Sequence, residues 1–383
     1  MNPSGSPWDA LAGQYQLRPG LSPGVAGQRP VLADGRLGRL LRGQRGAQVA
    51  RTLGSVFTLC AHAHRGTAQL ALAAALSQTD LAPATEQEAQ LCIETARDHL
   101  RSIALEWPQR LAALGADAAA LDWLRDCPLS LASAPPFTDA NAARDALHQL
   151  RGWLEARVLQ HDIHHWLAAQ REPDALAQWC SAHAARLTPA LCLAAWHALA
   201  HSMTPDTRCL DVLDVDPQLQ RQQVMQLASS LVEDADFVQR PTWLGRCAET
   251  GPWTRLRQRQ EPVRQTAWTR LSARWTELIE LAASDGQTGT ALLAAGALPL
   301  GNGQALAWSE MARGLLLHWV QLDAGGAVHD FRVLAPTEWN FHPAGALSLA
   351  LTALPIGATV AAQTLAAAYD PCVACVIQTG DIP

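Results

Sequence analysis

The sequence Asp370-Pro-Cys372-Val-Ala-Cys375, near the end of the chain, places two thiols three positions apart. Proline fixes its own φ and disfavours helix at the preceding residue, so Asp370-Pro371 predicts a turn that leads into the pair. A Cys-x-x-Cys pair is typical of a redox dithiol, of half a zinc site, or of a thiolate clamp on another metal. The apolar Val-Ala between the two cysteines argues against a solvated zinc knuckle. The spacing of the cysteines alone does not decide among these chemistries.

The composition predicts one large helical unit. Of the 383 residues, 49% are apolar, and many of these are alanine and leucine, which favour helix. No long polar linker interrupts the chain, so residues 1–383 are expected to form a single domain, with a Pro- and Gly-rich segment over about 1–30 that is irregular or partly extended. The start lacks the features of a secretory signal, and no run of eighteen apolar residues occurs. We therefore expect a cytoplasmic protein with no membrane contact.

The charge pattern gives no sign of a nucleic-acid partner. The net charge is −6 and arginine supplies all the fixed positive charge, since lysine is absent. The fourteen tryptophans are scattered and form no stacking ladder, so packing explains them. An Arg-rich stretch at about 252–260 is expected to be a surface loop or an exposed helical turn.

Periodicity predicts a mainly α (α+β) fold. After residue 286 the period changes: 314–322 and 327–334 predict two strands around a glycine turn, which gives a small antiparallel β region near 313–334. A weak strand candidate lies at 30–33, and a loop is expected over 335–343. Helical segments are expected within 37–76, 86–114, 138–167, 173–187, 189–201, 216–233, 263–283, 345–354 and 359–368.

Other cysteines and histidines give weaker signals. The nine cysteines are mostly isolated, as expected for small core residues in a reducing compartment. On a helix, Cys60 and His64 would share one face and could bind a metal, although the ordinary interpretation is that His62 and His64 are surface or core residues. Similarly, a helix would place His161 on one face with His164 or His165. A solvated or partly buried histidine face is the expected outcome there.

Three separated segments resemble the C-terminal half of [NiFe]-hydrogenase large subunits. They are Glu310-Met-Ala-Arg313-Gly-Leu-Leu-Leu-His-Trp319, Pro336-Thr337-Glu-Trp-Asn340 and Asp370-Pro-Cys372-Val-Ala-Cys375, and their order and spacing match the family. The stretch Leu40-Leu-Arg-Gly43 leading to Cys60 resembles the N-terminal metal-binding region of the same family. The resemblance implies the fold of that large subunit.

The resemblance also implies which parts of the metal site are present. In the family, two Cys-x-x-Cys pairs hold a nickel–iron centre whose iron carries cyanide and carbon monoxide. Cys372 and Cys375 match the C-terminal pair, and Cys60 matches the first cysteine of the N-terminal pair, but its partner position is Ala63. The proton-transfer glutamate is assigned to the position of Gly38. These losses imply that the chain is not an enzyme.

The C-terminal pattern departs from the family as well. Large-subunit precursors carry histidine or arginine after the last Cys-x-x-Cys and an extension that a protease removes, whereas this chain has Gln378 there. Arg313 and Thr337 match residues whose donors face the cyanide ligands. Guanidinium and hydroxyl donors suit buried anionic acceptors.

The pattern as a whole is similar to the accessory proteins of the HupK/HoxV type. The hypothesis it implies is a maturation scaffold that transiently holds iron as Fe(CN)2CO, without nickel. Cys372 and Cys375 would bind the iron, Cys60 would assist, and Arg313 and Thr337 would bind the cyanides. Expected partners are a maturation chaperone with its iron-loading complex as donor and the hydrogenase large-subunit precursor as acceptor.

Three other interpretations remain at this point. An active hydrogenase subunit conflicts with Ala63 and Gly38. A dithiol oxidoreductase would want a low-pKa cysteine at a helix start after a strand, and no βαβ pattern precedes Cys372. A degenerate scaffold that binds partners, with a zinc or empty site and no iron cargo, fits the residues as well.

Overall fold

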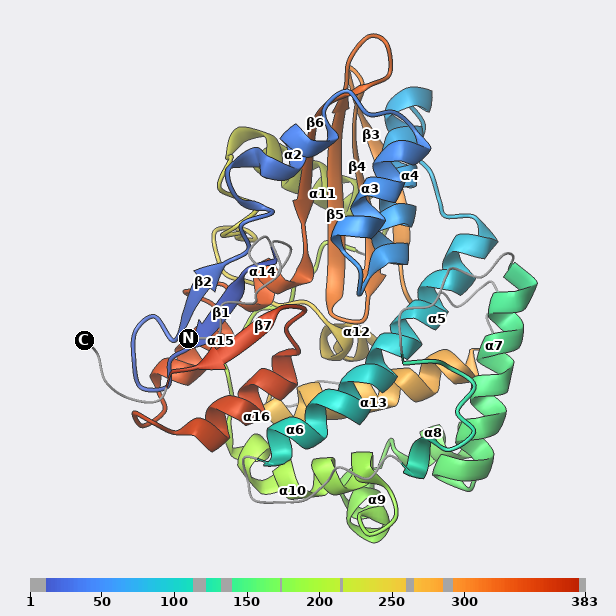
Figure 1. Cartoon of the computed structure of the whole chain (residues 1–383), viewed down its shortest axis with the longest axis vertical. Coiled ribbons are helices and arrows are strands. Elements are labelled where there is room, and N and C mark those ends of the chain that lie inside the picture. Colours follow the sequence, from blue (N-terminus) through green and yellow to red (C-terminus); the bar gives the residue numbers. More distant parts are fainter. Residues whose placement is uncertain are drawn as a thin grey trace, which may run out of the picture.

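A four-stranded antiparallel sheet forms the upper half of the molecule in Figure 1. The computed structural model describes residues 12–112, 122–131, 140–172, 174–213, 216–259, 265–284 and 292–378. In it, β3 (Ala295–Gly301), β4 (Gln304–Met311), β5 (Gly314–Leu322) and β6 (Val328–Leu334) pair in sequence order. The predicted strand pair near 313–334 is confirmed as β5 and β6.

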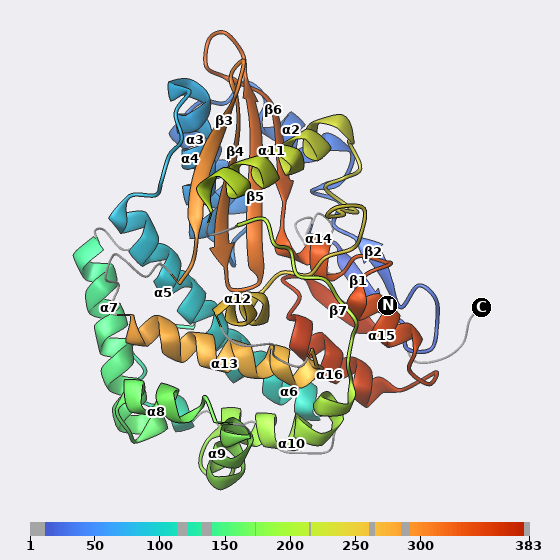
Figure 2. The same ribbon diagram turned by 180° about the vertical axis from the view of Figure 1, so that it is seen from behind.

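The first two strands of this sheet were not predicted. β3 and β4 are rich in alanine, with glycine and proline in β3, and these residues have low intrinsic strand propensity. A tight turn at Asn302 and Gly303, both with positive φ, joins them. Helices cover both faces: α3 (Ala47–Val56) and α4 (Ala61–Ser77) on one side, and α11 (Pro217–Glu233) on the other (Figures 1 and 2). Burial between helices therefore decides the structure of this segment.

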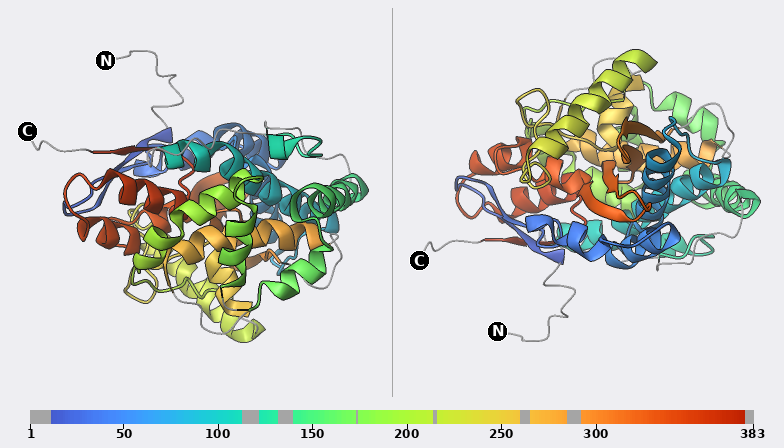
Figure 3. Two further views of the ribbon diagram at one scale, coloured as in Figure 1. Left: turned by 90° about the horizontal axis from the view of Figure 1, so that it is seen from below. Right: turned by 90° about the horizontal axis from the view of Figure 1, so that it is seen from above.

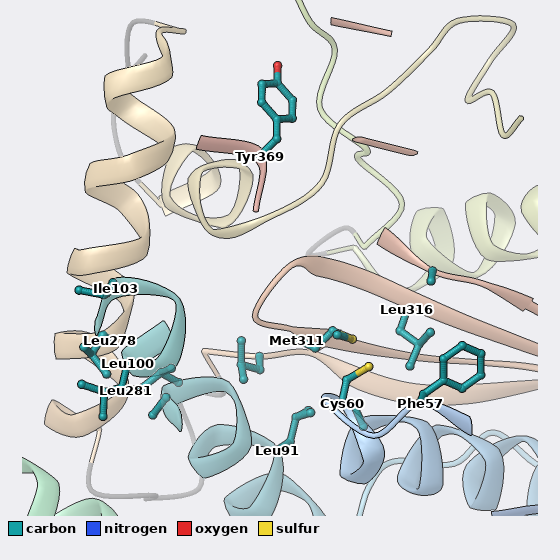
Figure 4. Close-up of a cluster of buried hydrophobic side chains, with 14 of the residues drawn as sticks. Phe57, Cys60, Leu91, Leu100, Ile103, Leu278, Leu281, Met311, Leu316 and Tyr369 are labelled. Carbon is teal, nitrogen blue, oxygen red and sulfur yellow. The ribbon is translucent and has the colours of Figure 1, made fainter. Parts of the chain in front are cut away.

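The lower half of the molecule is helical. α5 (Thr85–Arg101) continues through a π-helical segment, η2 (Ser102–Glu106), into α6 (Trp107–Leu111), and it packs against α13 (Ala267–Ala283). Leucine and isoleucine side chains of both elements meet in one apolar cluster (Figure 4). The other described elements are α2 (Arg36–Leu41), η4 (Asp122–Leu124), α7 (Ala140–Trp153), η5 (Leu154–Leu159), α8 (Ile163–Ala169), α9 (Ala175–His183), α10 (Thr188–Ser202), α12 (Pro252–Arg259), α14 (Pro336–Asn340), α15 (Ala346–Thr352) and α16 (Thr359–Tyr369).

A second, three-stranded sheet joins distant parts of the chain. β1 (Gln14–Leu17) pairs antiparallel with β2 (Val25–Gln28) and parallel with β7 (Ala374–Ile377). Figure 3 shows these strands together at one end of the molecule, opposite α7. The segment over about 1–30, expected to be irregular or partly extended, contains two short strands in the described residues from 12 on, and residues 1–11 lie outside the described residues. The strand expected at 30–33 is wrong too, because a turn and a 3-10 helix, η1 (Ala33–Gly35), follow Pro30.

Most helix predictions are confirmed, with three differences. The helix expected over 138–167 is interrupted after η5, where Gln160 has positive φ and Asp162 caps α8 by accepting from the His165 backbone N–H. The loop expected over 335–343 contains α14. The Arg-rich stretch at about 252–260 begins as α12, and the described side chains of its first turn, Arg255 included, are buried rather than exposed. No helix in the described part of the chain is long and apolar enough to cross a bilayer.

Candidate thiolate metal site

The C-terminal thiols follow α16 through the expected turn. Asp370 ends the helix with a left-handed backbone, and Cys372 lies in the bend before β7, which carries Cys375. The Thr337 hydroxyl and the Cys372 Sγ are hydrogen-bonded at 3.0 Å, so two predicted site residues from different segments meet. Burial raises the pKa of the Cys375 thiol to about 12. Cys375 therefore does not have the lowered pKa of a redox nucleophile.

A buried ion-pair network fixes this turn. The Asp370 carboxylate accepts from the Ser102 hydroxyl at 2.6 Å and lies 2.9 Å from Arg274 Nη1 and 3.1 Å from Arg313 Nε. Arg313 also donates to the Asp370 backbone oxygen at 3.1 Å and to Asp98 at 2.9 Å. Burial alone would raise the pKa of Asp370, but Arg274 and Arg313 hold it at about 2. The network holds the start of the thiol turn in one position.

Two further buried charge pairs join α13 to α12 and to the segment before α12. Arg270 binds both oxygens of Glu249, at 2.6 and 2.7 Å, and Arg255 binds both oxygens of Glu277 at 2.7 Å. The Tyr369 hydroxyl, just before the turn, donates to Glu249 at 3.2 Å. Sequence reasoning missed these residues. A usable signal was present, because the charged residues at 270, 274 and 277 recur at i, i+4 and i+7 and so share one face of the predicted helix.

The N-terminal thiol lies in a different setting. Cys60 precedes the first turn of α4, in the same apolar cluster as Phe57 and Leu91 (Figure 4). Burial raises the pKa of its thiol well above the ordinary value. The backbone N–H groups of His62 and Ala63 donate to the Glu94 carboxylate at 2.7 and 2.8 Å. The Glu94 carboxylate thus accepts hydrogen bonds from backbone N–H groups at the start of α4, and the side chain of Ala63 supplies no metal ligand.

One large open cavity connects the two thiol regions. Its volume is about 910 Å³, and its walls include Cys60, Cys372, Arg29 and Phe57, with residues of α3 along one side. Cys375, Arg313 and Thr337 do not line it. Within the described ranges, no three His, Cys, Asp or Glu side chains converge as a metal-ligand set. The structure therefore brings Cys60 and Cys372 to one space, and the predicted three-thiol metal site stays a prediction.

The histidines take the ordinary roles. His64 is buried, with Nδ1 3.0 Å from Nε2 of His318, and Phe57 stacks on its ring at 3.8 Å. One ring nitrogen of this imidazole is thus bonded in the core, which favours the ordinary interpretation, and the alternative of a Cys60–His64 metal pair stays a prediction. His161 lies before α8 rather than on a helix, so its predicted helical pairing is wrong as well. With His164 and His165 it is exposed, which confirms the solvated interpretation.

The assignment of Gly38 to the proton-transfer position is also wrong. Gly38 lies in α2 against β6, and a Cβ atom there would meet Asp330 Oδ1 at 2.6 Å. A side chain at this position would face the sheet and not the thiols. The residue opposite Cys375 in the β1–β7 pairing is Tyr15, which is buried. Tyr15 and Arg29 are site neighbours that sequence reasoning did not identify, because long-range pairing alone brings them there. Glu338 stands beside Thr337 in a quoted motif, but its pairing with Arg29 depends on the fold as well.

Two solved structures share this fold. The NAD+-reducing [NiFe]-hydrogenase in the H2-reduced state aligns with a TM-score of 0.50 at 15% identity, covering 90% of both chains. The reduced Ni-Fe-Se hydrogenase from D. vulgaris Hildenborough aligns with a TM-score of 0.51 at 14% identity, covering 91% of this chain and 92% of its own. A family model described as nickel-dependent hydrogenase matches residues 262–378. The fold is thus that of [NiFe]-hydrogenase large subunits, here without a thiol at position 63.

Curated relatives identify the family. HoxV of Cupriavidus necator, a hydrogenase expression/formation protein, is 38% identical and aligns with 95% of this chain and 94% of its own. HupK of Rhizobium leguminosarum bv. viciae, with the same description, is 30% identical over 88% of each chain. The chain belongs to the hydrogenase expression/formation proteins of the HoxV and HupK type.

Proposed function

We propose that this protein is a non-catalytic maturation scaffold for [NiFe]-hydrogenase, which transiently holds an Fe(CN)2CO group and passes it to the hydrogenase large-subunit precursor. The observation that carries the proposal is the shared cavity of Cys372 and Cys60, with a tightly paired C-terminal side and no thiol at position 63. Soft thiolates suit low-spin iron, and a site with fewer ligands releases its cargo more readily.

The residues near Cys372 support cargo binding. In this proposal Cys372 and Cys375 bind the iron and Cys60 assists. Thr337 lies at hydrogen-bond distance from Cys372. Arg313 is buried, and its Nη2 has no hydrogen-bond partner among the described residues, which leaves one donor for a cyanide nitrogen. No nickel is expected, because Ala63 removes one of the thiolates that the complete centre requires.

The alternatives fit the geometry less well. An active hydrogenase subunit would need a second N-terminal thiol, and Ala63 provides none. A dithiol oxidoreductase would want its first cysteine at a helix start, whereas Cys372 lies in the bend between α16 and β7. A partner-binding scaffold without iron remains the second candidate, because the metal-free thiols are not gathered into a ligand set among the described residues.

The partners and location follow from the proposal. The donor would be a maturation chaperone with its iron-loading complex, and the acceptor would be the large-subunit precursor. Both encounters would take place in the cytoplasm, where the reducing compartment keeps thiols free.

Infrared spectroscopy and metal analysis of protein purified anaerobically with its maturation partners test the proposal. We expect CO and CN stretching bands with iron and without nickel, and their loss in a Cys372→Ser/Cys375→Ser double variant. Cys127→Ser, which changes an isolated half-buried thiol, is the matched control and should keep the bands. Absence of bands from the wild-type protein, or their survival in the double variant, would overturn the proposal.

A further inference from the structure

We infer that Arg29 is a second anion-binding residue of the thiol cavity, which donates a hydrogen bond to an anionic ligand of the metal-bound group, and that Glu338 positions it. This inference rests on the proposed function and adds a residue that neither the Cys-x-x-Cys pair nor the hydrogenase-like motifs indicate. Arg29 follows β2 directly, and the cavity wall contains it together with Cys60 and Cys372.

Arg29 is a buried cation with few partners. Its side chain is 6% exposed, and the one ion pair that it forms with the described residues, to Glu338 Oε1, is 3.5 Å long, which exceeds a good hydrogen bond. Arg29 Nε and both Glu338 carboxylate oxygens have no hydrogen-bond partner among the described residues. A buried guanidinium with so few partners is costly. Because Arg29 lines the cavity, a ligand there is the natural source of a further acceptor for its guanidinium.

The contrast with Arg313 strengthens the inference. Arg313 has two carboxylates, Asp98 and Asp370, at 2.9 and 3.1 Å, and its position is fully determined by them. Arg29 has a single, more distant carboxylate and the face of Phe57, whose ring centroid lies 5.6 Å from its Cζ. Both guanidinium groups interact electrostatically with Cys372. Arg29 is therefore the less compensated cation and the one that lines the open space.

The chemistry of the Arg29–Glu338 pair indicates which kind of ligand it would bind. A guanidinium that pairs with one carboxylate keeps further N–H groups for a ligand, and such groups favour small anionic acceptors. A metal-bound cyanide nitrogen has this character, whereas carbon monoxide is a poor acceptor. Arg29 would thus bind a cyanide on the cavity side of the iron, and Arg313 would bind one on the buried side.

The test compares Arg29→Gln with Arg51→Gln in protein loaded with the iron group. Arg51 lines the same cavity but is exposed, so it is the matched control. We expect Arg29→Gln to lower bound iron by about tenfold to a hundredfold and to shift the CN bands of the remaining loaded protein, while Arg51→Gln leaves both unchanged. An Arg29→Gln/Glu338→Gln double variant, which removes both charges together, covers the case in which the single variant does not fold.

A second measurement separates this inference from the proposed function. Azide, a linear anion whose stretching frequency reports hydrogen bonding, is titrated into the metal-free protein. A saturable azide band in the wild type and in Arg51→Gln, lost in Arg29→Gln, would support Arg29 as an anion donor even if no CO or CN bands are found and the cargo proposal fails. Unchanged CN bands in loaded Arg29→Gln, or an azide band that does not depend on Arg29, would overturn the inference.

Discussion

The two thiol regions of the molecule differ in how completely their neighbours are paired. Around Cys372, Asp370 is bound by Ser102, Arg274 and Arg313 at 2.6 to 3.1 Å, all of them buried. Around Cys60, the chain provides an alanine where a thiol is expected, and a half-buried Glu94 that binds two backbone N–H groups. The buried ion pairs hold the C-terminal side in one geometry. The N-terminal side has fewer paired groups, so fewer existing contacts would be lost if a metal bound there.

The difference suggests a division of roles. Breaking a buried charge pair leaves an uncompensated charge, so the C-terminal side resists rearrangement. The Cys60 side offers one thiol at the wall of an open cavity. In the proposed scaffold, the first side would fix the cargo and the second would admit and release it.

The largest expected effect comes from removing the charge at the centre of the C-terminal side. Asp370→Asn keeps a residue type that tolerates the left-handed backbone but leaves Arg274 and Arg313 under-compensated. We expect a loss of about 3–5 kcal/mol in the free energy of unfolding, measured by urea denaturation. The control, Arg157→Gln, breaks the exposed ion pair with Asp126 and should change it by about 0–1 kcal/mol. If Asp370→Asn and Arg157→Gln lowered the free energy of unfolding equally, the buried ion pairs would be no more stabilising than an exposed one.

The two thiols should differ in cargo retention. Cys372→Ser is expected to reduce the bound iron group by about a hundredfold or more, because it removes a ligand from the fixed side. Cys60→Ser should reduce it by about tenfold or less, measured by iron analysis and CN band intensity after the same purification. If Cys60→Ser retained as much of the iron group as the wild type, the Cys60 thiol would have no part in binding it. If Cys60→Ser lost more of the iron group than Cys372→Ser, the division of roles would be contradicted.

Glu94 should make the stability of the N-terminal side depend on pH. Burial, with the nearby Asp98, raises the pKa of Glu94 to about 7. A group whose folded pKa is raised stabilises most below its unfolded pKa, and that contribution is lost as pH rises through the folded pKa. We expect stability to fall between about pH 4.5 and 7, by up to about 1.4 kcal/mol per pH unit.

Replacement by glutamine tests this dependence. Glu94→Gln should flatten the stability profile in that window, measured by urea denaturation at a series of pH values. Glu86→Gln, at an exposed position of the same helix, should leave the slope unchanged. A Glu94→Gln protein that keeps the wild-type slope would assign the dependence to another group.

The smallest effect is expected at the hydroxyl beside Cys372. Thr337→Val keeps the shape of the side chain and removes its hydrogen bond to the thiol, so we expect a loss of about 0.5–1.5 kcal/mol in unfolding free energy. Thr58→Val, at an exposed position on the cavity wall, should stay within about 0.5 kcal/mol. A Thr337→Val protein as stable as wild type would show that this contact contributes nothing without the metal group.

The parts of the structure that depend on local chemistry were predictable from the sequence. The Asp-Pro turn before Cys372 and most of the helices follow from backbone restriction and periodicity. β3 and β4 were not predictable in this way, because their alanine- and glycine-rich residues become strands only between α4 and α11. The places of Tyr15, Arg29 and Glu338 near the thiols were not predictable for a related reason. Each belongs to a different segment, and only the tertiary fold makes them neighbours of the thiols.

The parallel pairing of β1 with β7 has a consequence for how the protein is made. Gln14 pairs with Ala374 and Leu17 with Ile377, which are nearly the most distant positions in the described chain. A ribosome adds residues in order, so β1 emerges early and has no partner until β7 has left the exit tunnel. Since Cys375 lies on that last strand, the two C-terminal thiols take their place in the fold only after translation has passed them. In the proposed scaffold, an unfinished chain would therefore have no complete site for its cargo.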